Sequence, residues 1–550
     1  MSTQAAPRPP YSTHPGPSGG PPPLRLGAAA AAVFVVHLAV AAWGPYELHR
    51  DALLYLAMGE HLHLLRMDFP PFIALVAAAE RLLGESLVII HVGPAAAHAA
   101  LVVLAGLFAR RYGGGPAAQG LAAFVVATAP VFMRGGALFQ PVVFDQLWWT
   151  LALYVLARIG EGTVHGRRVG SRSGRSDFLR IPASEGGRWT LLGVVLGLGL
   201  LTKFTILVLG AAIAIGLVAS PLRRTLLTPW PWAAAALAFL IGSPSISGQV
   251  ALDWPFLNQF ADLRHAQLFR ISRTAFAAEQ LLMVGPAVLI AVAGAAALIL
   301  RRVAPGLRAV GWTTIAAFGL MLLLNGKPYY IAPIWPALLG IGMAEAERWA
   351  RGLARRRPFV ALGFRALVGV AVVGFGVVAL PMGLPFLPPE PMARYAARLG
   401  VTQAVTTNTG EVLELPQDYA DMLGWEALAD SVARVYRELP PADRERAVIL
   451  ATNYGRAGAI DFYAGDEIPH AVAPVGSYWF WGPGDRPGAV TVAVGAEVED
   501  LVGEYFRIAV EATRVRNPWG VPEERDVPIV IAREPIRPLQ DLWPRFRGAN

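Results

Sequence analysis

The stretch "SLVIIHVGPAAAHAALVVLAGLFA", residues 86–109, contains no Asp, Glu, Lys or Arg and is followed directly by Arg110 and Arg111. About 20 mainly apolar residues let a helix cross the roughly 30 Å hydrocarbon core of a bilayer, so this run predicts a membrane span. Runs of the same kind recur along the chain and together decide the fold. They lie at 26–43, 117–133, 140–159, 189–202, 204–220, 230–247, 279–300, 309–325, 328–345 and 359–380. The sequence therefore predicts a mainly α-helical polytopic membrane protein with about 11 transmembrane helices.

The composition of the whole chain agrees with this class. Of the 550 residues 55% are hydrophobic and 16% are charged, and the mean hydropathy is +0.46. The chain has no cysteine, which excludes disulfides, thiolate catalysis and thiolate metal sites. The formal net charge is +8, but the arginines are spread among short connections and form no single basic face. We therefore expect no nucleic-acid partner.

The basic residues predict how the helices are oriented. Lys and Arg accumulate in short cytoplasmic loops, and alternate connections of this chain carry them, at 110–111, 158–188, 223–224, 301–308 and 348–365. We therefore expect a multi-pass protein of the plasma membrane whose N-terminus is cytoplasmic. Residues 1–23 are rich in Pro, Gly and Ser and predict a disordered cytoplasmic tail. Ala39-Val40-Ala41 resembles a signal-peptidase site, but the apolar run before it is long for a signal peptide, so we expect the first span to be retained.

Two outward connections are long, and the chain changes character after the last span. The first connection covers 44–85 and contains two apolar stretches, "HRDALLYLAMGEHLHLL" and "PPFIALVAAAERLL", that predict helices at the bilayer surface. The second covers 247–278. Later, the short β-rich runs "AVILATNY", "AVTVAVG" and "VPIVIA" accompany the helical pattern of "ADMLGWEALADSVARVYREL". The sequence predicts a transmembrane catalytic domain over 24–380 and an extracytoplasmic α/β domain over 381–550.

Two carboxylates at the predicted outward face are candidates for function. Asp51 follows the first span, and Tyr55 lies four residues later on the same face of a helix. Asp145, in "FQPVVFDQLWW", lies near the outer end of the fourth span, where a buried charge is costly and commonly functional. A solvated interfacial carboxylate is the alternative for Asp51. As a pair, the two could bind a cation and orient a nucleophile.

The chain contains only two lysines, and both are predicted at outward helix ends. Lys203 lies in "LTKFT" and Lys327 in "NGKPYY". Ammonium groups at this mouth suit an anionic lipid head group or phosphate, although lysines at span ends also commonly snorkel to the interface. Asp68 precedes two prolines that fix an extended turn and direct its carboxylate. It is predicted either to contact substrate or to cap a helix.

A series of stretches occurs in a characteristic order along the membrane region: "HRDALLYL", "DFPPFIAL", "LFQPVVFDQLWW", "LTKFT", "DWPFLNQF" and "NGKPYYIAPIWPALL". In order and content they resemble bacterial members of glycosyltransferase family 39, the protein-mannosyltransferase-like branch of the GT-C superfamily. The later stretches "LPQDYADMLGWEAL", "NYGRAGAIDFY" and "SYWFWGPG" resemble extracytoplasmic domains of some members. The likeness extends over most of the chain.

The resemblance implies an enzyme that takes a sugar from a polyprenyl-phosphate donor and transfers it, outside the membrane, to a protein, glycolipid or polysaccharide acceptor. The first outward loop of the family commonly carries an Asp-Glu pair. Here Asp51 matches the Asp, but Ala52 stands where Glu is common, which puts in doubt any role that needs the second carboxylate. Asp145 matches the acidic residue of the fourth span. The residues that fall where the family faces the lipid phosphate are Lys203, Lys327, Tyr329 and Tyr330.

These residue types suit an inverting transfer reaction. We expect Asp51 to act as general base on an acceptor hydroxyl, Asp145 to position substrate or a divalent cation, and the two lysines to stabilise the leaving phosphate. Mg²⁺ or Mn²⁺ bound by Asp51 or Asp145 is an open alternative, although the missing second carboxylate argues against a required metal. A lipid or solute transporter that uses the same charges is the alternative function. Transporters tend to show repeated halves and mid-depth sites, and a lipid-binding scaffold would need no base.

Overall fold

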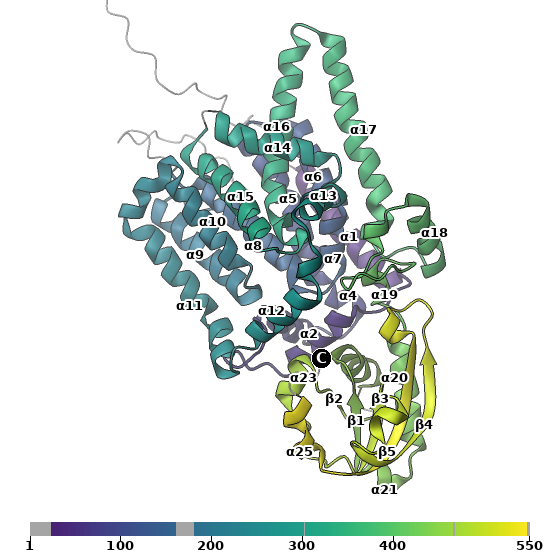
Figure 1. Ribbon diagram of the computed structural model, residues 1–550. Helices are drawn as coiled ribbons and strands as arrows, with labels where there is room; N and C mark the ends of the chain where they lie inside the picture. The colour runs from purple at the N-terminus through teal and green to yellow at the C-terminus, as the bar shows by residue number, and fades with distance from the viewer. Residues whose placement is uncertain (1–23, 161–180, 302, 466–467, 547–550) are drawn as a thin grey trace, which may run out of the picture.

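The computed structural model describes residues 24–160, 181–301, 303–465 and 468–546. It consists of a bundle of long helices and a smaller C-terminal part built on a five-stranded sheet (Figure 1). This arrangement confirms the predicted fold class. The predicted tail over 1–23 and most of the basic connection between Arg158 and Arg188 lie outside the described residues. The domain boundaries and the number of membrane spans stay predictions.

Every apolar run that was predicted as a span contains helix in the structure. The bundle helices are α1 (Leu24–Trp43), α5 (Val92–Arg111), α6 (Pro116–Thr128), α7 (Pro130–Ala137), α8 (Pro141–Arg158), α9 (Glu185–Thr202), α10 (Ile206–Val218), α11 (Pro229–Ala251), α13 (Arg273–Val284), α14 (Ala287–Leu300), α15 (Pro305–Leu323), α16 (Trp335–Ala354) and α17 (Pro358–Gly383). Among the described residues, five helices can cross a membrane by length and composition, or up to eight if each of three bent pairs is one span. The three other predicted spans correspond to α8, α9 and α16.

Small residues let the bundle helices approach closely, as in other membrane bundles. A Cβ at Gly193 of α9 would lie only 2.6 Å from the carbonyl oxygen of Ala234 on α11. A Cβ at Gly342 of α16 would collide with the carbonyl oxygen of Ile290 on α14. These glycines therefore set the spacing of two neighbouring helix pairs.

Shorter helices connect the bundle to the C-terminal part. The first predicted outward connection contains α2 (Arg50–Glu60) and α3 (Phe72–Arg81) and is followed by α4 (Leu87–Ile90), and the second contains α12 (Pro255–Ala266) and the 3₁₀ helix η2 (Leu268–Arg270). The two helices expected in the first connection are α2 and α3. Leu53 of α2 lies directly against Gly458 of the C-terminal part. The helix α2 is therefore enclosed between the two parts of the molecule, and does not lie bare on a bilayer surface as expected.

The C-terminal part is a mixed sheet surrounded by helices. Its strands are β1 (Ala447–Ala451), β2 (Ala471–Val472), β3 (Val490–Val494), β4 (Phe506–Arg516) and β5 (Asp526–Pro535), and its helices are α18 (Pro389–Leu399), α19 (Gln417–Ala420), α20 (Trp425–Glu438), α21 (Pro441–Arg444), α22 (Tyr454–Ala459), α23 (Gly476–Trp481), α24 (Val498–Leu501) and α25 (Leu539–Leu542). The sheet order is β2-β1-β3-β5-β4. β1 runs parallel to β2 and β3, whereas β5 runs antiparallel to β3 and β4. The carboxyl end of β1 leads into α22, which packs on α2.

Candidate active site

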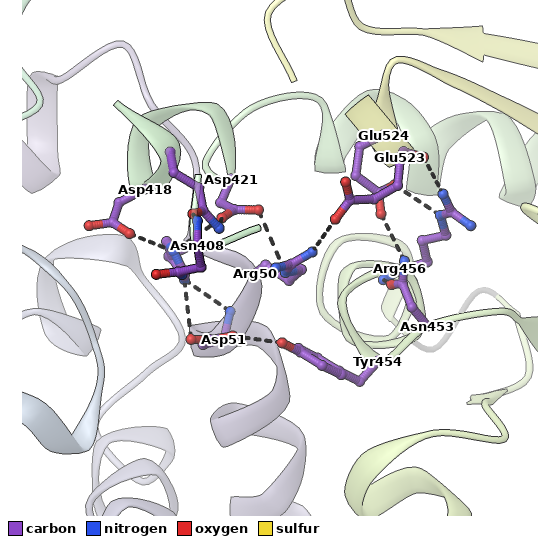
Figure 2. Close-up of polar contacts among 12 residues, drawn as sticks. Arg50, Asp51, Asn408, Asp418, Asp421, Asn453, Tyr454, Arg456, Glu523 and Glu524 are labelled. Atoms are coloured by element: carbon purple, nitrogen blue, oxygen red, sulfur yellow. Dashed lines mark hydrogen bonds and ion pairs between the residues drawn. The ribbon is translucent and has the colours of Figure 1, made fainter. Parts of the chain in front are cut away.

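Asp51 lies in the first turn of α2, where the bundle meets the C-terminal part (Figure 2). His49 caps this helix, because its Nδ1 accepts a hydrogen bond from the Asp51 backbone N–H at 3.0 Å. Asp51 Oδ1 accepts a hydrogen bond from the Tyr454 hydroxyl at 2.9 Å, and Oδ2 accepts one from Gln140 Nε2 at 3.1 Å. The Asp51 side chain is 31% exposed. The carboxylate is therefore fixed in orientation and still accessible.

Tyr454 is held in place by a buried polar cluster behind it (Figure 2). It is the first residue of α22, and the preceding Asn453 caps that helix by accepting a hydrogen bond from the Arg456 backbone N–H at 2.9 Å. Asn453 Nδ2 and Arg456 Nε also donate to the Glu524 carboxylate, at 2.8 and 2.9 Å. Arg456 and Glu524 are both buried. The position of the Tyr454 hydroxyl is thus set by the fold of the C-terminal part.

An ionic network joins the two parts beside Asp51. Arg134 of α7 pairs with Asp418 of α19, with 3.1 Å between Nε and Oδ2. His49 Nε2 lies 3.8 Å from carboxylate oxygens of both Asp418 and Asp421. Arg50 Nε lies 3.6 Å from Asp421 Oδ1. The acidic segment around α19 therefore connects three basic side chains of the bundle part.

The network perturbs the acid–base behaviour of its members. Burial raises the pKa of Asp421 to about 6, although Arg50 and His49 oppose this. Burial also raises the pKa of Asp418, but Arg134 and His49 lower it more, so the pKa of Asp418 lies below its ordinary value. Burial lowers the pKa of His49, whereas the neighbouring carboxylates raise it to above the ordinary value. The helix cap needs Nδ1 without a proton, and the neutral tautomer with its proton on Nε2 satisfies the cap while keeping a donor beside Asp418 and Asp421.

The two lysines lie at the same junction. Lys327 precedes the 3₁₀ helix η3 (Pro328–Ile334) and is within Coulombic reach of Asp51 and Asp418. Burial lowers the pKa of Lys327. Lys203 ends α9 and is within Coulombic reach of Lys327. Lys327 therefore lies near the Asp51 carboxylate, and Lys203 lies near Lys327.

Asp145 and the two predicted tyrosines surround Lys203. The Lys203 ammonium lies 4.3 Å from the ring centre of Tyr330 and 5.4 Å from that of Tyr329, within the range of cation–π attraction. Asp145 is buried near Lys203, and its Oδ2 accepts a hydrogen bond from the Thr205 hydroxyl at 2.9 Å. This places one carboxylate and two aromatic rings around one ammonium group.

Asp68 and Tyr55 complete the set of predicted site residues. Asp68 is buried, and its two oxygens lie 2.8 and 2.9 Å from the hydroxyl of Ser477 in the C-terminal part. Burial raises the pKa of Asp68 to about 6. Tyr55 lies near Asp51, Tyr454 and Asp68. Asp68 therefore has a partner in the protein, and a substrate contact for it stays a prediction.

The structure brings the eight predicted site residues into one region, but it does not join the two candidate acids as a pair. Asp51 is held by Tyr454 and Gln140, whereas Asp145 is held by Thr205. Sequence reasoning did not include in the site the five members of the ionic network or the two residues that hold Asp51, which are Arg50, Arg134, His49, Asp418, Asp421, Gln140 and Tyr454. Two signals were available: "PQDYAD" carries two acids three residues apart, and Gln140 directly precedes the proline that starts α8.

The residues do not fit a divalent-cation site. Among the described residues, no group of three or more His, Cys, Asp or Glu side chains could hold a metal ion. Both oxygens of Asp51 already accept hydrogen bonds, and Asp145 lies beside an ammonium group. A hard cation such as Mg²⁺ needs several oxygen ligands and is repelled by that ammonium group.

The comparisons with known proteins agree with this architecture. Residues 178–247 match the family model described as dolichyl-phosphate-mannose-protein mannosyltransferase. ArnT from Cupriavidus metallidurans is similar in structure, in the apo state (TM-score 0.55) and bound to undecaprenyl phosphate (TM-score 0.56), with 17% identity over 92% of this chain and 97% of that chain in both cases. The Archaeoglobus fulgidus oligosaccharyltransferase in complex with Zn and sulfate has a TM-score of 0.50 and 12% identity over 84% of this chain and 68% of that chain. No curated protein sequence matches the chain significantly. The chain therefore shares the fold of ArnT, and over residues 178–247 its sequence matches the mannosyltransferase family model, in agreement with the resemblance seen in the sequence.

Proposed function

We propose that the protein is a membrane glycosyltransferase that transfers a sugar from a polyprenyl-phosphate donor to an extracytoplasmic acceptor. The observation that carries this proposal is the junction itself, where the accessible, oriented Asp51 carboxylate lies near Lys327, and Lys327 lies near Lys203. The fold shared with ArnT, one structure of which is bound to undecaprenyl phosphate, supports a lipid-phosphate donor. The sugar and the acceptor are left open.

In the proposed reaction Asp51 acts as the general base. Its carboxylate takes the proton of an acceptor hydroxyl, the acceptor oxygen forms a bond to the anomeric carbon, and the bond from that carbon to the phosphate oxygen breaks with inversion. The carrier phosphate leaves with the electron pair, and Lys203 and Lys327 stabilise its developing charge. Tyr454 and Gln140 hold the base in position, and Asp145 orients Lys203.

The location of the charges favours an enzyme over a transporter. The ionisable groups gather at one end of the bundle and contact the C-terminal part, whereas a transporter tends to bind its substrate near mid-depth between repeated halves. The proposal places this junction on the outer face of the plasma membrane, with the N-terminus in the cytoplasm, in line with the arginine distribution.

The test supplies the purified protein with labelled polyprenyl-phosphate sugars and follows the loss of lipid-linked label. We expect the wild-type protein to consume at least one donor. Asp51→Asn should abolish consumption while the lipid still binds, because the amide has no basic oxygen. Asp430→Asn is the matched control, since Asp430 is exposed on α20 and is not among the residues that form the junction. Donor binding without consumption by the wild type, or full activity of Asp51→Asn, would contradict the proposal.

A further inference from the structure

The helix α12 presents an apolar face that no other part of the described protein covers. Of its twelve residues, Pro255 alone is buried, while Leu257 is 58% and Phe260 is 42% exposed. At 3.6 residues per turn, Leu257 and Phe260 lie on one face, Arg264 follows on the same face near the end of the helix, and Asp262 lies on the opposite face. A surface helix of a soluble protein turns such a face toward the core. Another apolar medium is therefore needed to cover α12.

The direction of α12 is fixed by the chain that precedes it. Asp253 and Trp254 both have positive φ angles, 62° and 55°, which are costly for residues other than glycine. Gln249, buried near the end of α11, holds this turn: its Oε1 accepts a hydrogen bond from the Phe256 backbone N–H at 2.8 Å. Gln249 Nε2 donates to the Asp68 carbonyl oxygen at 2.6 Å. The strained turn is thus tied to the site region and orients α12 across the end of the bundle (Figure 1).

The candidate membrane span that directly precedes α12 also has exposed apolar side chains. The helix α11 qualifies as a span by length and composition, and its Leu240 and Val250 are 69% and 61% exposed. Trp254 lies between the two helices and is 43% exposed, in keeping with the enrichment of Trp at membrane interfaces. Arg264 and Arg270 are exposed on α12 and η2 and can contact anionic head groups.

We propose that α12 docks into the surface of the bilayer leaflet at the end of α11, with Leu257 and Phe260 at the hydrocarbon boundary and Arg264 among anionic head groups. The helix is also close to the site, because the rings of Phe256 and Phe204 are 4.7 Å apart and Phe204 follows Lys203. Membrane lipid is thereby brought next to Lys203. This proposal rests on exposure and position and does not depend on the proposed function.

The absence of native cysteine allows single spin labels on the full-length protein. Leu257→Cys and Phe260→Cys place a label on the apolar face, and Asp262→Cys places the matched control on the opposite face. The protein is reconstituted in nanodiscs of phosphatidylethanolamine and phosphatidylglycerol without any prenyl phosphate. Accessibility of each label to molecular oxygen, which concentrates in hydrocarbon, and to a water-soluble nickel chelate is then measured.

We expect a severalfold higher ratio of oxygen to nickel accessibility at 257 and 260 than at 262. Equal nickel accessibility at all three positions would overturn the proposal, because the face would then lie in water. Protection from both reagents, with spin–spin broadening between copies, would instead assign the face to a second copy of the chain. If the labels at 257 and 260 become accessible to oxygen only after undecaprenyl phosphate is added, the apolar face of α12 binds the prenyl chain of the donor. That result would equally overturn docking on the bilayer.

Discussion

The hydrogen bond between Tyr454 and Asp51 joins residues 403 positions apart and orients the proposed base. Hydrogen bonds to charged groups are worth about 1.5 to 3 kcal/mol. Where the free energy of the Tyr454–Asp51 hydrogen bond stabilises the transition state, its loss in Tyr454→Phe should lower kcat by about 10- to 100-fold. The KM for the donor should stay unchanged. Tyr436→Phe is the matched control, because the Tyr436 hydroxyl donates to the carbonyl oxygen of Arg444, away from the site. Steady-state kinetics would count against this role if Tyr454→Phe kept its kcat.

Asp68 gives a prediction about stability and pH. Its pKa is raised to about 6 in the folded protein, whereas an unfolded Asp has a pKa of about 3.9. The folded state therefore holds the proton more tightly, and the stabilisation present below about pH 4 is lost as the pH rises through about 6, by up to about 3 kcal/mol. Asp68→Asn avoids burying this charge, and an amide can still accept a hydrogen bond from Ser477. We expect Asp68→Asn to raise Tm at pH 8, with the difference vanishing at pH 4.

The same variant separates the two roles predicted for Asp68. A purely structural carboxylate gives a more stable protein with an unchanged KM for the donor. A substrate contact gives a raised KM despite the higher Tm. A lower Tm at pH 8 would contradict the account of its buried charge.

At the scale of elements, Glu47 links the first connection to α20. Its carboxylate accepts hydrogen bonds from the backbone N–H groups of Gly424, Trp425 and Glu426, at 3.1, 2.6 and 3.1 Å. The N-terminus of a helix carries unpaired N–H donors and a partial positive charge, so a carboxylate there is stabilising. We expect Glu47→Ala to destabilise the docking of α20 by about 1 to 2 kcal/mol.

Limited proteolysis between residues 384 and 424 and thermal unfolding measure this effect. Glu85→Ala is the matched control, because Glu85 is exposed and forms an ion pair with Arg81, the last residue of α3. Equal protease resistance of Glu47→Ala and Glu85→Ala would show that this cap does not hold the two parts together.

Local patterns predicted most elements, and the exceptions have a physical cause. The runs predicted as strands correspond to β1, β3 and β5, and the amphipathic stretch corresponds to α20. The strand β4 was missed because it is an edge strand whose exposed positions carry charges such as Arg507, Glu511 and Arg516. Charged side chains are common on edge strands and hide the alternating pattern of a half-buried strand.

For the molecule as a whole, local sequence could identify only half of the site. Asp51, Asp145 and the two lysines stood out because each is an ionisable group beside a long apolar run. Asp418 and Tyr454 lie in a polar region, where an acid or a tyrosine is ordinary. Their importance arises only when the C-terminal part packs on the bundle, and a single sequence does not reveal that contact.

The junction between the two parts can be tested as a unit through Arg134 and Asp418. Arg134 lies in the bundle and Asp418 in the C-terminal part, 3.1 Å apart, and their pairing helps to keep Tyr454 against Asp51. We expect Arg134→Gln and Asp418→Asn each to lower kcat/KM. The double variant should lose less than the product of the two effects, with a coupling energy of about 1 to 3 kcal/mol. The exposed pair Arg394 and Glu390 within α18 is the control and should show neither an activity loss nor measurable coupling. Strictly multiplicative losses at Arg134 and Asp418 would mean that the two parts act on catalysis independently of this ion pair.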